Sequence, residues 1–199
     1  SLLPAELQPT SIMDLARPEW KGRFGIAPAG ADFQAIVSAV LFLKGPEETA
    51  AWRSGLKENA RIYSGNRGIM VAANNGEIEG GIIYHYYWYG DRAESGASSS
   101  NVELLYFGGK DPGGFISVSG GGVLRSSKYP AEAQQFLAYI TGPQGQQMLS
   151  NSAAMEYAIG SGVENSKLKP LSELDPPAVD VSKLNGPLVV ELMQRAGLL

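Results

Sequence analysis

The spacing of apolar residues after position 32 constrains the fold of this chain more than any other sequence feature. Large apolar side chains recur there at intervals of three and four residues, at Phe33, Ile36, Val37, Val40 and Leu41. This is the period of one face of an amphipathic helix. Asp32 is placed to cap this helix and Gly45-Pro46 to end it. Because residues 23–27 read as a short strand that enters a turn at 28–31, the pattern predicts a strand followed by a helix.

Later segments extend this alternation and together indicate an α/β protein. A second helix begins at Pro46 and buries Trp52 and Leu56, and a third covers residues 66–75. The run 80–88 is rich in β-branched and aromatic residues, so we predict a strand there. The remaining predicted elements are a short capped helical turn at 10–15, strands over 102–107 and 115–118, helices over 131–140 and 144–149, a proline-rich crossing over 157–187 and a last helix through 189–193.

Composition excludes several kinds of chemistry. The chain has no cysteine, which excludes thiolate catalysis, cysteine-based zinc sites and disulfides. Its single histidine is His85, so a Ser-His-Asp relay would have to pass through that residue, and a multi-histidine metal site is excluded. The formal charge of -4 comes from 16 basic and 20 acidic residues without a sustained basic stripe, which argues against nucleic acid as a partner.

The sequence has no feature of a membrane-inserted segment. No apolar run approaches the roughly 20 residues that a membrane span needs. Residues 1–4 lack the charged and apolar regions of a signal peptide. We therefore expect a soluble chain that is either cytosolic or a processed or truncated form of an exported protein, with the signal region absent from it.

The sharpest local feature is a run of six ring-bearing residues from Tyr84 to Tyr89. On a regular strand Tyr86 and Tyr87 would point to opposite faces, but a backbone that turns where the strand ends could bring both phenols to one point. Paired phenolates suit a trivalent cation, which can displace the phenol proton despite a pKa of about 10, and they favour Fe(III) over zinc or copper. The alternative interpretation is that the rings fill a core or form a stacking platform for a sugar.

The turn before the first helix is a second candidate site. Gly30, Ala31 and Asp32 lie there, and backbone N–H groups at a helix N-terminus readily hold an anion. The plainer interpretation is that Asp32 only caps the helix. Asn66 has the same two interpretations, as a cap or as a polar group that faces the same cleft.

The sequence does not assemble an active site. The carboxylates of the middle region have the spacing of solvated faces and offer no catalytic pair: Glu77, Glu79, Asp91, Glu94 and Glu103. The glycine-rich stretches match neither the phosphate loop nor the dinucleotide fingerprint. We therefore predict that the chain is not an enzyme, and a small-molecule enzyme with His85 as general base is kept only as an alternative.

Taken in order, several short segments resemble the bacterial ferric-iron-binding proteins, which are members of the type II periplasmic-binding-protein group. The similarity covers nearly the whole chain and depends on the order and spacing of segments that are individually weak. They are LARPEWKGR (15–23), FQ (33–34), NNGEI (74–78), YYWY (86–89), SGGGVL (119–124), PAEAQQF (130–136), QGQQ (144–147) and EY (156–157). The pair Tyr86 and Tyr87 matches the iron-binding motif of the family.

The resemblance implies a two-lobed α/β protein with a central mixed sheet flanked by helices. Ligand would bind in the cleft between the lobes, and hinge closure would present it to an ABC permease in the membrane. Such a protein is the extracytoplasmic solute-binding component of an ABC importer, either periplasmic or a cell-surface lipoprotein. Tyr86 and Tyr87 would be ligands of Fe(III). In relatives that bind a synergistic anion, this anion would rest on the positions of Gly30, Ala31, Asp32 and Asn66.

Two departures from the family pattern bear on the site. The family often has two asparagines where this chain has Tyr84 and His85, and these two side chains either supply accessory ligands or fill space. The family also has a small hydroxyl residue or a glycine where this chain has Asp32. Because a carboxylate there should repel phosphate or carbonate, we expect Asp32 to weaken anion synergy or itself to reach the metal.

Length is a further departure, since family members carry much more chain before the segment that matches Leu3. The resemblance therefore implies that the first lobe is largely missing. Residues 1–116 would form most of the second lobe, 117–167 would return through the first lobe, and 168–199 would cross back and pack a helix on the second lobe.

Two expectations follow from this organisation. The helix at 131–140 would lack its sheet partner, and its exposed apolar face predicts self-association, swapping or disorder. Within the same fold, the alternative to iron is an organic ligand such as a phosphonate, a polyamine or a sugar, stacked on Tyr86 to Tyr89.

Overall fold

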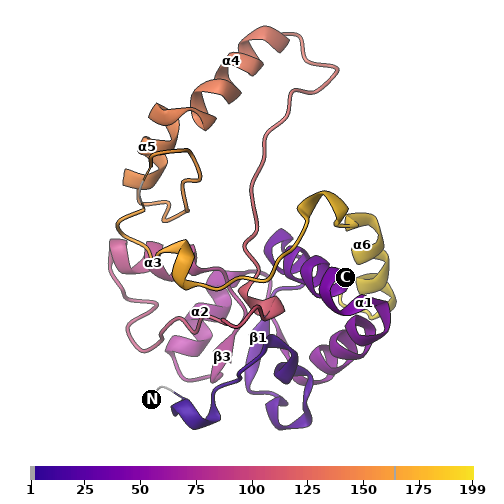
Figure 1. Cartoon of the computed structure of the whole chain (residues 1–199). Helices are drawn as coiled ribbons and strands as arrows, with labels where there is room; N and C mark the ends of the chain where they lie inside the picture. Colours follow the sequence, from indigo (N-terminus) through magenta and orange to yellow (C-terminus); the bar gives the residue numbers. More distant parts are fainter. Residues whose placement is uncertain (1–2, 164) are drawn as a thin grey trace. The chain divides into compact units, whose positions relative to one another are not determined.

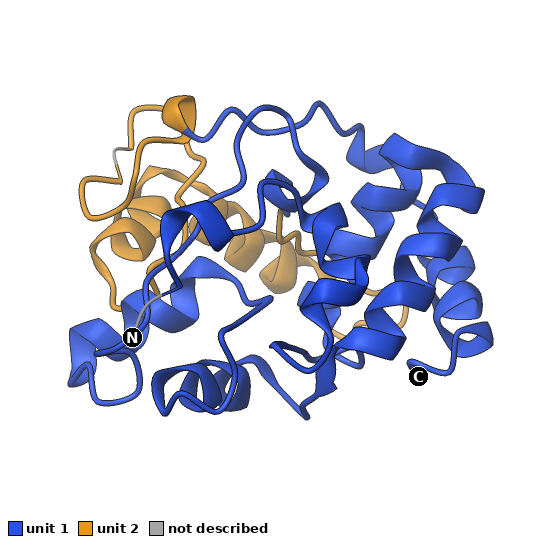
Figure 2. Ribbon diagram, turned by 90° about the horizontal axis from the view of Figure 1, so that it is seen from below, with its two compact units in different colours: residues 1–117, 174–199 blue, residues 118–173 orange. Residues whose placement is uncertain are grey.

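The computed structural model describes residues 3–163 and 165–199 and divides the chain into two compact units (Figure 2). Unit 1 contains residues 1–117 and 174–199, and unit 2 contains residues 118–173. The sheet lies in unit 1, whereas unit 2 is built around two helices.

The sheet of unit 1 is small and parallel. Its strands are β1 (Phe24–Ile26), β2 (Arg61–Ile62) and β3 (Gly80–Gly81), arranged in the order β2-β1-β3. In the register, Gly25 of β1 lies opposite Arg61 on one side and Gly81 on the other. The expected strand near residues 23–27 is confirmed, but the sheet is parallel, not mixed.

Helix α1 spans Ala31–Asn59 and is kinked at Gly45, which has a φ of 78°. Glycine adopts this left-handed conformation at little cost, and Pro46 follows it directly. The two helices predicted on either side of Gly45 are therefore confirmed, and α1 joins them at this kink. Trp52 and Leu56 of the second half are buried, as predicted.

The other helices of unit 1 follow strands or close the chain: α2 over Asn66–Asn74, α3 over His85–Glu94 and α6 over Gly186–Arg195. Short 3-10 helices of unit 1 cover Ala5–Leu7, Ile12–Ala16, Pro18–Trp20, Pro112–Gly114 and Val181–Lys183, and another covers Leu171–Glu173 at the end of unit 2. The predicted capped turn is the helix Ile12–Ala16. Its capping box joins Ser11 and Asp14, each of which accepts a backbone N–H with its side chain.

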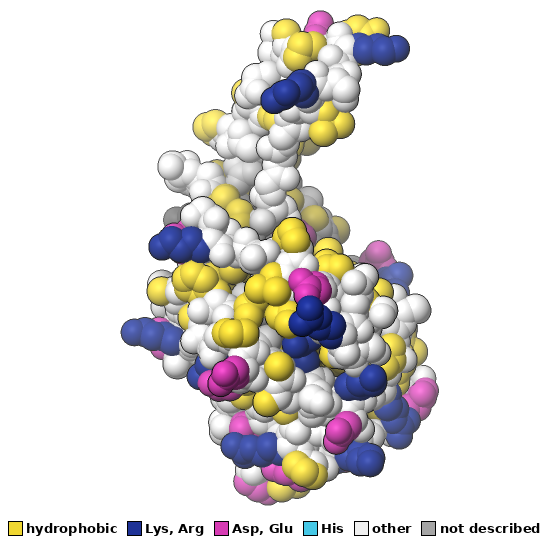
Figure 3. Space-filling model, turned by 90° about the vertical axis from the view of Figure 1, so that its right-hand side faces the viewer, with side chains coloured by type: hydrophobic (Ala, Val, Ile, Leu, Met, Phe, Trp, Pro, Cys, Tyr) yellow, Lys and Arg dark blue, Asp and Glu magenta, His cyan; other side chains and the backbone are white. Residues whose placement is uncertain are grey.

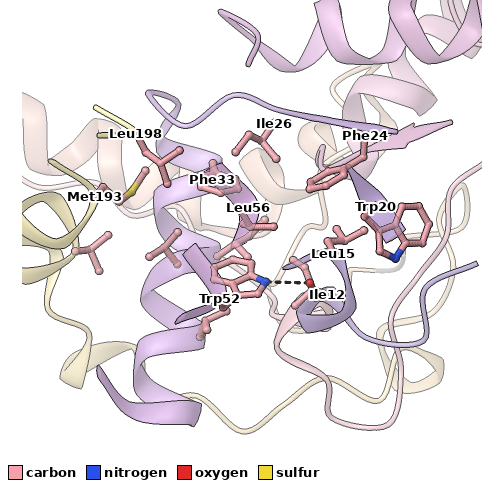
Figure 4. Packing of buried hydrophobic residues seen from close by; sticks show 14 residues of the cluster. Ile12, Leu15, Trp20, Phe24, Ile26, Phe33, Trp52, Leu56, Met193 and Leu198 are labelled. Atoms are coloured by element: carbon pink, nitrogen blue, oxygen red, sulfur yellow. Dashed lines mark hydrogen bonds between the residues drawn. The ribbon is translucent and has the colours of Figure 1, made fainter. Parts of the chain in front are cut away.

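The main core of unit 1 packs β1 against α1 and α6, which lie side by side (Figures 1 and 4). The Trp52 ring stacks on Phe33 with 6.4 Å between ring centroids, and its Nε1 donates to the Ile12 carbonyl oxygen at 3.0 Å. The indole is thus buried with its polar atom satisfied. Of the predicted core positions of α1, Leu41 is half-buried. The other four are buried: Phe33, Ile36, Val37 and Val40.

A smaller apolar cluster covers the opposite face of β1. Phe24 and Ile26 belong to the main core, whereas a side chain at Gly25 would meet Tyr63 and Ile78. The second cluster consists of Ala27, Ile69, Ala72 and Ile78. Because successive strand residues point to opposite faces, α1 and α2 cover opposite faces of the sheet. Unit 1 is therefore an α/β layer structure, as the sequence predicts.

The surface drawn in Figure 3 mixes apolar side chains with interspersed basic and acidic ones. Several large apolar side chains of the described residues are exposed, for example Ile62 in unit 1 and Leu124 and Tyr129 in unit 2. In the described part of the chain, no helix combines the length and the apolar character that crossing a membrane requires.

Unit 2 contains α4 (Pro130–Thr141) and α5 (Pro143–Asn151), which confirms both predicted helices and the break between them. Neither helix buries a residue. On the predicted apolar face of α4, Phe136 is 62% exposed, while Leu137 is half-buried and lies beside Gly121. Self-association through this face stays a prediction, which sedimentation velocity would test.

Of three further predicted strands, one is much shorter than predicted and two are absent from the described residues. The run 80–88 forms only the two residues of β3 before α3 begins at His85. Segments 102–107 and 115–118 form no strand, and within the described residues no strand pairs with them. Strand propensity reflects packing on a neighbouring strand, so aromatic and β-branched residues do not form a ladder where no partner lies alongside.

An exposed ion pair joins the chain segments next to β1 and β3. Nε of Arg23 donates to Oε1 of Glu79 at 2.9 Å, and the Arg23 guanidinium lies 4.8 Å from the centroid of the Trp20 ring. The hydrogen bond from Arg23 lowers the pKa of Glu79. A carboxyl group with a lowered folded-state pKa stabilises the fold above its unfolded pKa and loses that contribution as the pH falls through its folded pKa.

Replacing Glu79 with glutamine is expected to lower the free energy of unfolding by at most about 1 kcal/mol at neutral pH, because water and salt screen an exposed pair. In acid, below the folded-state pKa of Glu79, the variant and the unmodified chain should be equally stable. Urea unfolding at both pH values measures this, with the exposed Glu6→Gln as the control. A stability difference that persists in acid would contradict the pairing.

Candidate metal centre

Three strand-to-helix connections end at the same edge of the sheet. β1 leads to α1, β2 to α2 and β3 to α3, so in this parallel sheet all three helices begin at the carboxyl edge. After β1 the chain forms β2 on one side of it and then crosses to form β3 on the other side. This reversal makes the carboxyl end of β1 a topological switch point, where open α/β sheets form ligand sites.

Side chains from the first turns of these helices meet at one carboxylate oxygen. Oδ2 of Asp32, on α1, accepts a hydrogen bond from Nδ2 of Asn66, on α2, at 2.7 Å. The same oxygen accepts hydrogen bonds from the phenols of Tyr86 and Tyr87, on α3, at 2.9 and 3.3 Å. Asn66 is buried and the other three side chains are half-buried. We call Asp32, Asn66, Tyr86 and Tyr87 the Asp32 cluster.

The tyrosine pair converges because it lies on a helix and not on a strand. Tyr86 and Tyr87 are in the first turn of α3, and their ring centroids are 4.6 Å apart with 33° between the ring planes. Successive helix residues point about 100° apart, whereas strand residues alternate between faces. The predicted strand would have separated the two phenols, and its replacement by a helix is what lets both reach Asp32.

The surroundings of Tyr86 hold its phenol neutral. Burial raises the pKa of Tyr86 far above its ordinary value, and the hydrogen bonds with Tyr87 and with the Asp32 carboxylate raise it further. Protons therefore stay on the phenol in the metal-free protein. The positive N-terminal ends of α1 and α3 lie at the same place and favour negative charge there once a proton is displaced.

Asp32 is not the cap of α1. The N-cap residue is Gly30, and no side chain caps the helix, which begins at Ala31. The amide N–H of Gly30 donates to the Ala27 carbonyl oxygen at 3.1 Å, so this group is already engaged in the turn. Asp32 instead turns its carboxylate to Asn66 and the tyrosine pair, because these donors converge on it from two other helices.

Tyr84 and His85 surround the tyrosine pair with ring contacts. Tyr84 is the N-cap residue of α3 and packs in part against the main core. Its ring meets Tyr86 edge-on at 5.9 Å between centroids, and the His85 ring meets Tyr86 at 5.7 Å and Tyr89 at 6.1 Å. These contacts are of the kind expected for side chains that fill space around Tyr86.

The Asp32 cluster offers oxygen donors to a metal ion. Its two phenols and its carboxylate are the kind of ligand that a trivalent cation prefers. In the part of the chain that the structure describes, no group of three His, Cys, Asp or Glu side chains is placed to hold a metal ion. A metal bound by this unit would therefore depend on the phenols as well as on Asp32.

One buried carboxylate near the cluster contradicts the sequence-based expectation. Asp91 is predicted on a solvated face, but it is only 4% exposed and accepts hydrogen bonds from Ser98 N and Ser99 Oγ. The signal in the sequence is the serine run after the end of α3, since hydroxyl and amide donors there can return to a helix carboxylate.

Comparison with known proteins gives a consistent family and fold. Residues 2–179 match the family described as bacterial extracellular solute-binding protein. An Fe(3+)-binding periplasmic protein of Serratia marcescens is 53% identical over 98% of this chain, and a major ferric iron-binding protein of Neisseria meningitidis is 33% identical over 94% of it. The crystal structure of iron-bound HitA from Pseudomonas aeruginosa is similar at a TM-score of 0.90 and 41% identity over 98% of this chain.

These relatives are longer than the chain. It spans 60% and 57% of the length of the two sequence relatives and 63% of the HitA chain. The similarity therefore covers nearly the whole of this chain but only a part of each relative.

Proposed function

The chain belongs to the family of bacterial extracellular solute-binding proteins, and we propose that it binds ferric iron outside the cytoplasm for an ABC importer. The convergence of Tyr86 and Tyr87 on one oxygen of Asp32 carries this proposal. The names of the two sequence relatives and of the iron-bound neighbour support ferric iron as the ligand. We infer a role in transport and not in catalysis, in the periplasm or at the cell surface, with a membrane permease as partner.

Iron capture would exchange phenol protons for metal. In the metal-free cluster both phenols donate to Asp32, so a cation that enters among these oxygens replaces two O–H contacts. The raised pKa of Tyr86 means that a cation must be a strong Lewis acid to displace its proton. Fe(III) meets this requirement better than divalent ions do, and it prefers oxygen ligands.

We infer that Asp32 takes the place of a synergistic anion. It accepts a hydrogen bond from Asn66, which is one of the groups expected to hold such an anion, and it lies in the first turn of α1, where negative charge is favoured. A phosphate or carbonate ion placed beside Asp32 would be repelled by its charge. Iron binding by this chain is therefore expected not to require an added anion.

We further propose that unit 1 is one lobe of a two-lobed binding protein. The observed limits of unit 2, residues 118 and 173, are close to the predicted return segment 117–167 and support this division. The tyrosine pair and Asp32 would supply one side of the iron shell. Further donors would come from the facing lobe, as in other proteins that close two lobes over a ligand.

Titration of the protein with Fe(III) supplied as the citrate complex is expected to produce a visible phenolate-to-iron charge-transfer band. Zn(II) and Mg(II) should produce none, because neither has a metal-centred acceptor state for this transition, and they serve as controls. Absorbance and bound iron per chain are measured together. Stoichiometric iron without a visible band would refute the phenolate site.

A further inference from the structure

The helix that carries the tyrosine pair has little apolar packing of its own. Within α3, Asp91 is the one buried residue, and the residues from Tyr86 to Trp88 are half-buried. A helix of this length is marginal by itself and takes its stability and direction from tertiary contacts. For α3 several of these contacts are polar and come from the segment that follows it, residues 95–101, which we call the strap.

The strap closes over the buried carboxylate of Asp91. Oδ2 of Asp91 accepts hydrogen bonds from Ser98 N at 3.0 Å and from Ser99 Oγ at 2.7 Å, and Ser99 is fully buried. The Asp91 carbonyl oxygen also accepts from the N–H groups of Ser95 and Gly96, at 2.9 and 2.7 Å. Hydrogen bonds to a buried carboxylate are charge-assisted and stronger than neutral ones, so Asp91 anchors the strap to α3.

The strap is also tied to the end of α2. Oδ1 of Asn74, the last residue of α2, accepts from Asn101 N at 2.9 Å, and Nδ2 of Asn74 donates to the Ala97 carbonyl oxygen at 3.2 Å. Immediately beyond the strap, Nε1 of Trp88 donates to the Val102 carbonyl oxygen at 3.0 Å. The strap therefore joins the C-terminal ends of α2 and α3, whose N-terminal ends carry Asn66 and the tyrosine pair.

We propose that Asp91, Ser99 and Asn74 are positioning residues that set the tyrosine pair against Asp32, an inference that rests on the proposed iron site. Asp91 is four residues after Tyr87 and lies on the same face of α3, so a displacement at Asp91 moves Tyr87 with the helix. A ligand constellation must be held to about 0.5 Å to keep its geometry. Loss of the strap contacts would leave α3 held to α2 by the exposed ion pair between Arg67 and Glu94, and the looser helix would lengthen the approach of both phenols to the metal.

Replacing Ser99 with alanine tests this proposal, because it removes one hydrogen bond to Asp91 without touching the Asp32 cluster. We expect Fe(III) affinity, measured by competition with citrate, to fall roughly 10-fold to 100-fold, as for other residues that orient metal ligands. The maximum of the phenolate-to-iron band should also shift, which a general loss of stability would not cause. Ser98→Ala is the matched control, since Ser98 contacts Asp91 through its backbone N–H.

Asn74→Ala is the second variant, and it too should lower Fe(III) affinity and shift the band. It tests the positioning role if Ser99→Ala does not fold. Unchanged affinity and band position in the folded variants would overturn the proposal, and so would an equal effect of Ser98→Ala. If the unmodified chain shows no iron band, the proposed function fails and the positioning role is tested without metal. The ring proton NMR signals of Tyr86 and Tyr87 should then shift in Ser99→Ala but not in Ser98→Ala, and signals that stay in place would reject the role.

Discussion

Phenylalanine at both Tyr86 and Tyr87 is expected to abolish the visible absorption of the ferric protein. Each change deletes a phenol oxygen that points at Asp32 and keeps the ring, so the contact between the two rings is retained. Affinity for Fe(III) should fall by more than about 100-fold, because loss of a ligand exceeds the effect of losing a group that only orients one. Absorbance spectra and citrate competition measure the two effects, and unfolding of the metal-free variant shows whether it is folded.

The matched control for this double variant is Tyr89→Phe. Tyr89 belongs to the same helix and the same aromatic run, and its ring contacts His85, but its phenol is not one of the donors to Asp32. It should keep the band and the affinity. A band that survives in the double variant would show that other groups hold the iron, and an equal loss in Tyr89→Phe would show that the ring cluster and not the phenol pair matters.

Helical periodicity is enough to predict the buried face of α1. The apolar positions of α1 and the stop at Gly45-Pro46 lie where the pattern predicts, because burial of one helix face is read directly from spacing. β2 was not predicted at all. Its two residues, Arg61 and Ile62, are both exposed and too few to form a pattern, and they are fixed by pairing with β1.

The error at residues 80–88 has a definite physical cause. The run has the composition of a strand, yet β3 ends at Gly81 and α3 starts after Tyr84, whose side chain forms no capping hydrogen bond. The usual serine, threonine or aspartate signal of a helix start is therefore missing. What favours the helix is tertiary: the strap contacts at Asp91 and the hydrogen bonds of the phenols to Asp32.

The candidate site shows the same division between local and long-range information. The sequence proposes Asp32, Asn66, Tyr86 and Tyr87 from separate local arguments and from the family resemblance. It does not indicate that one oxygen of Asp32 receives all three donors, since this depends on the strand order β2-β1-β3, which brings the starts of three helices together. Local reasoning therefore assigned Asp32 to capping, the role that its position in the chain alone suggests.

Serine at position 32 is expected to make iron binding depend on an added anion. The change removes a negative charge and an oxygen donor from the centre of the Asp32 cluster and frees the amide of Asn66. In buffer without phosphate or carbonate, affinity for Fe(III) should fall by more than about 100-fold, beyond the range for a group that merely orients a ligand. Phosphate should then restore much of it, because the first turn of α1 and Asn66 can hold an anion once the carboxylate no longer repels it.

The comparison that decides this is iron titration of the unmodified chain and of Asp32→Ser, each with and without phosphate. Glu47→Gln controls for loss of a carboxylate from α1, since Glu47 is exposed and lies in the second half of the same helix. Strong phosphate dependence in the unmodified chain would show that Asp32 does not replace the anion. If the low iron affinity of Asp32→Ser does not rise with phosphate, the carboxylate acts only as an oxygen donor. The first turn of α1 and Asn66 then do not form an anion site. The unmodified chain thus tests whether the charge of Asp32 makes an added anion unnecessary, and Asp32→Ser tests separately whether an anion can take its place.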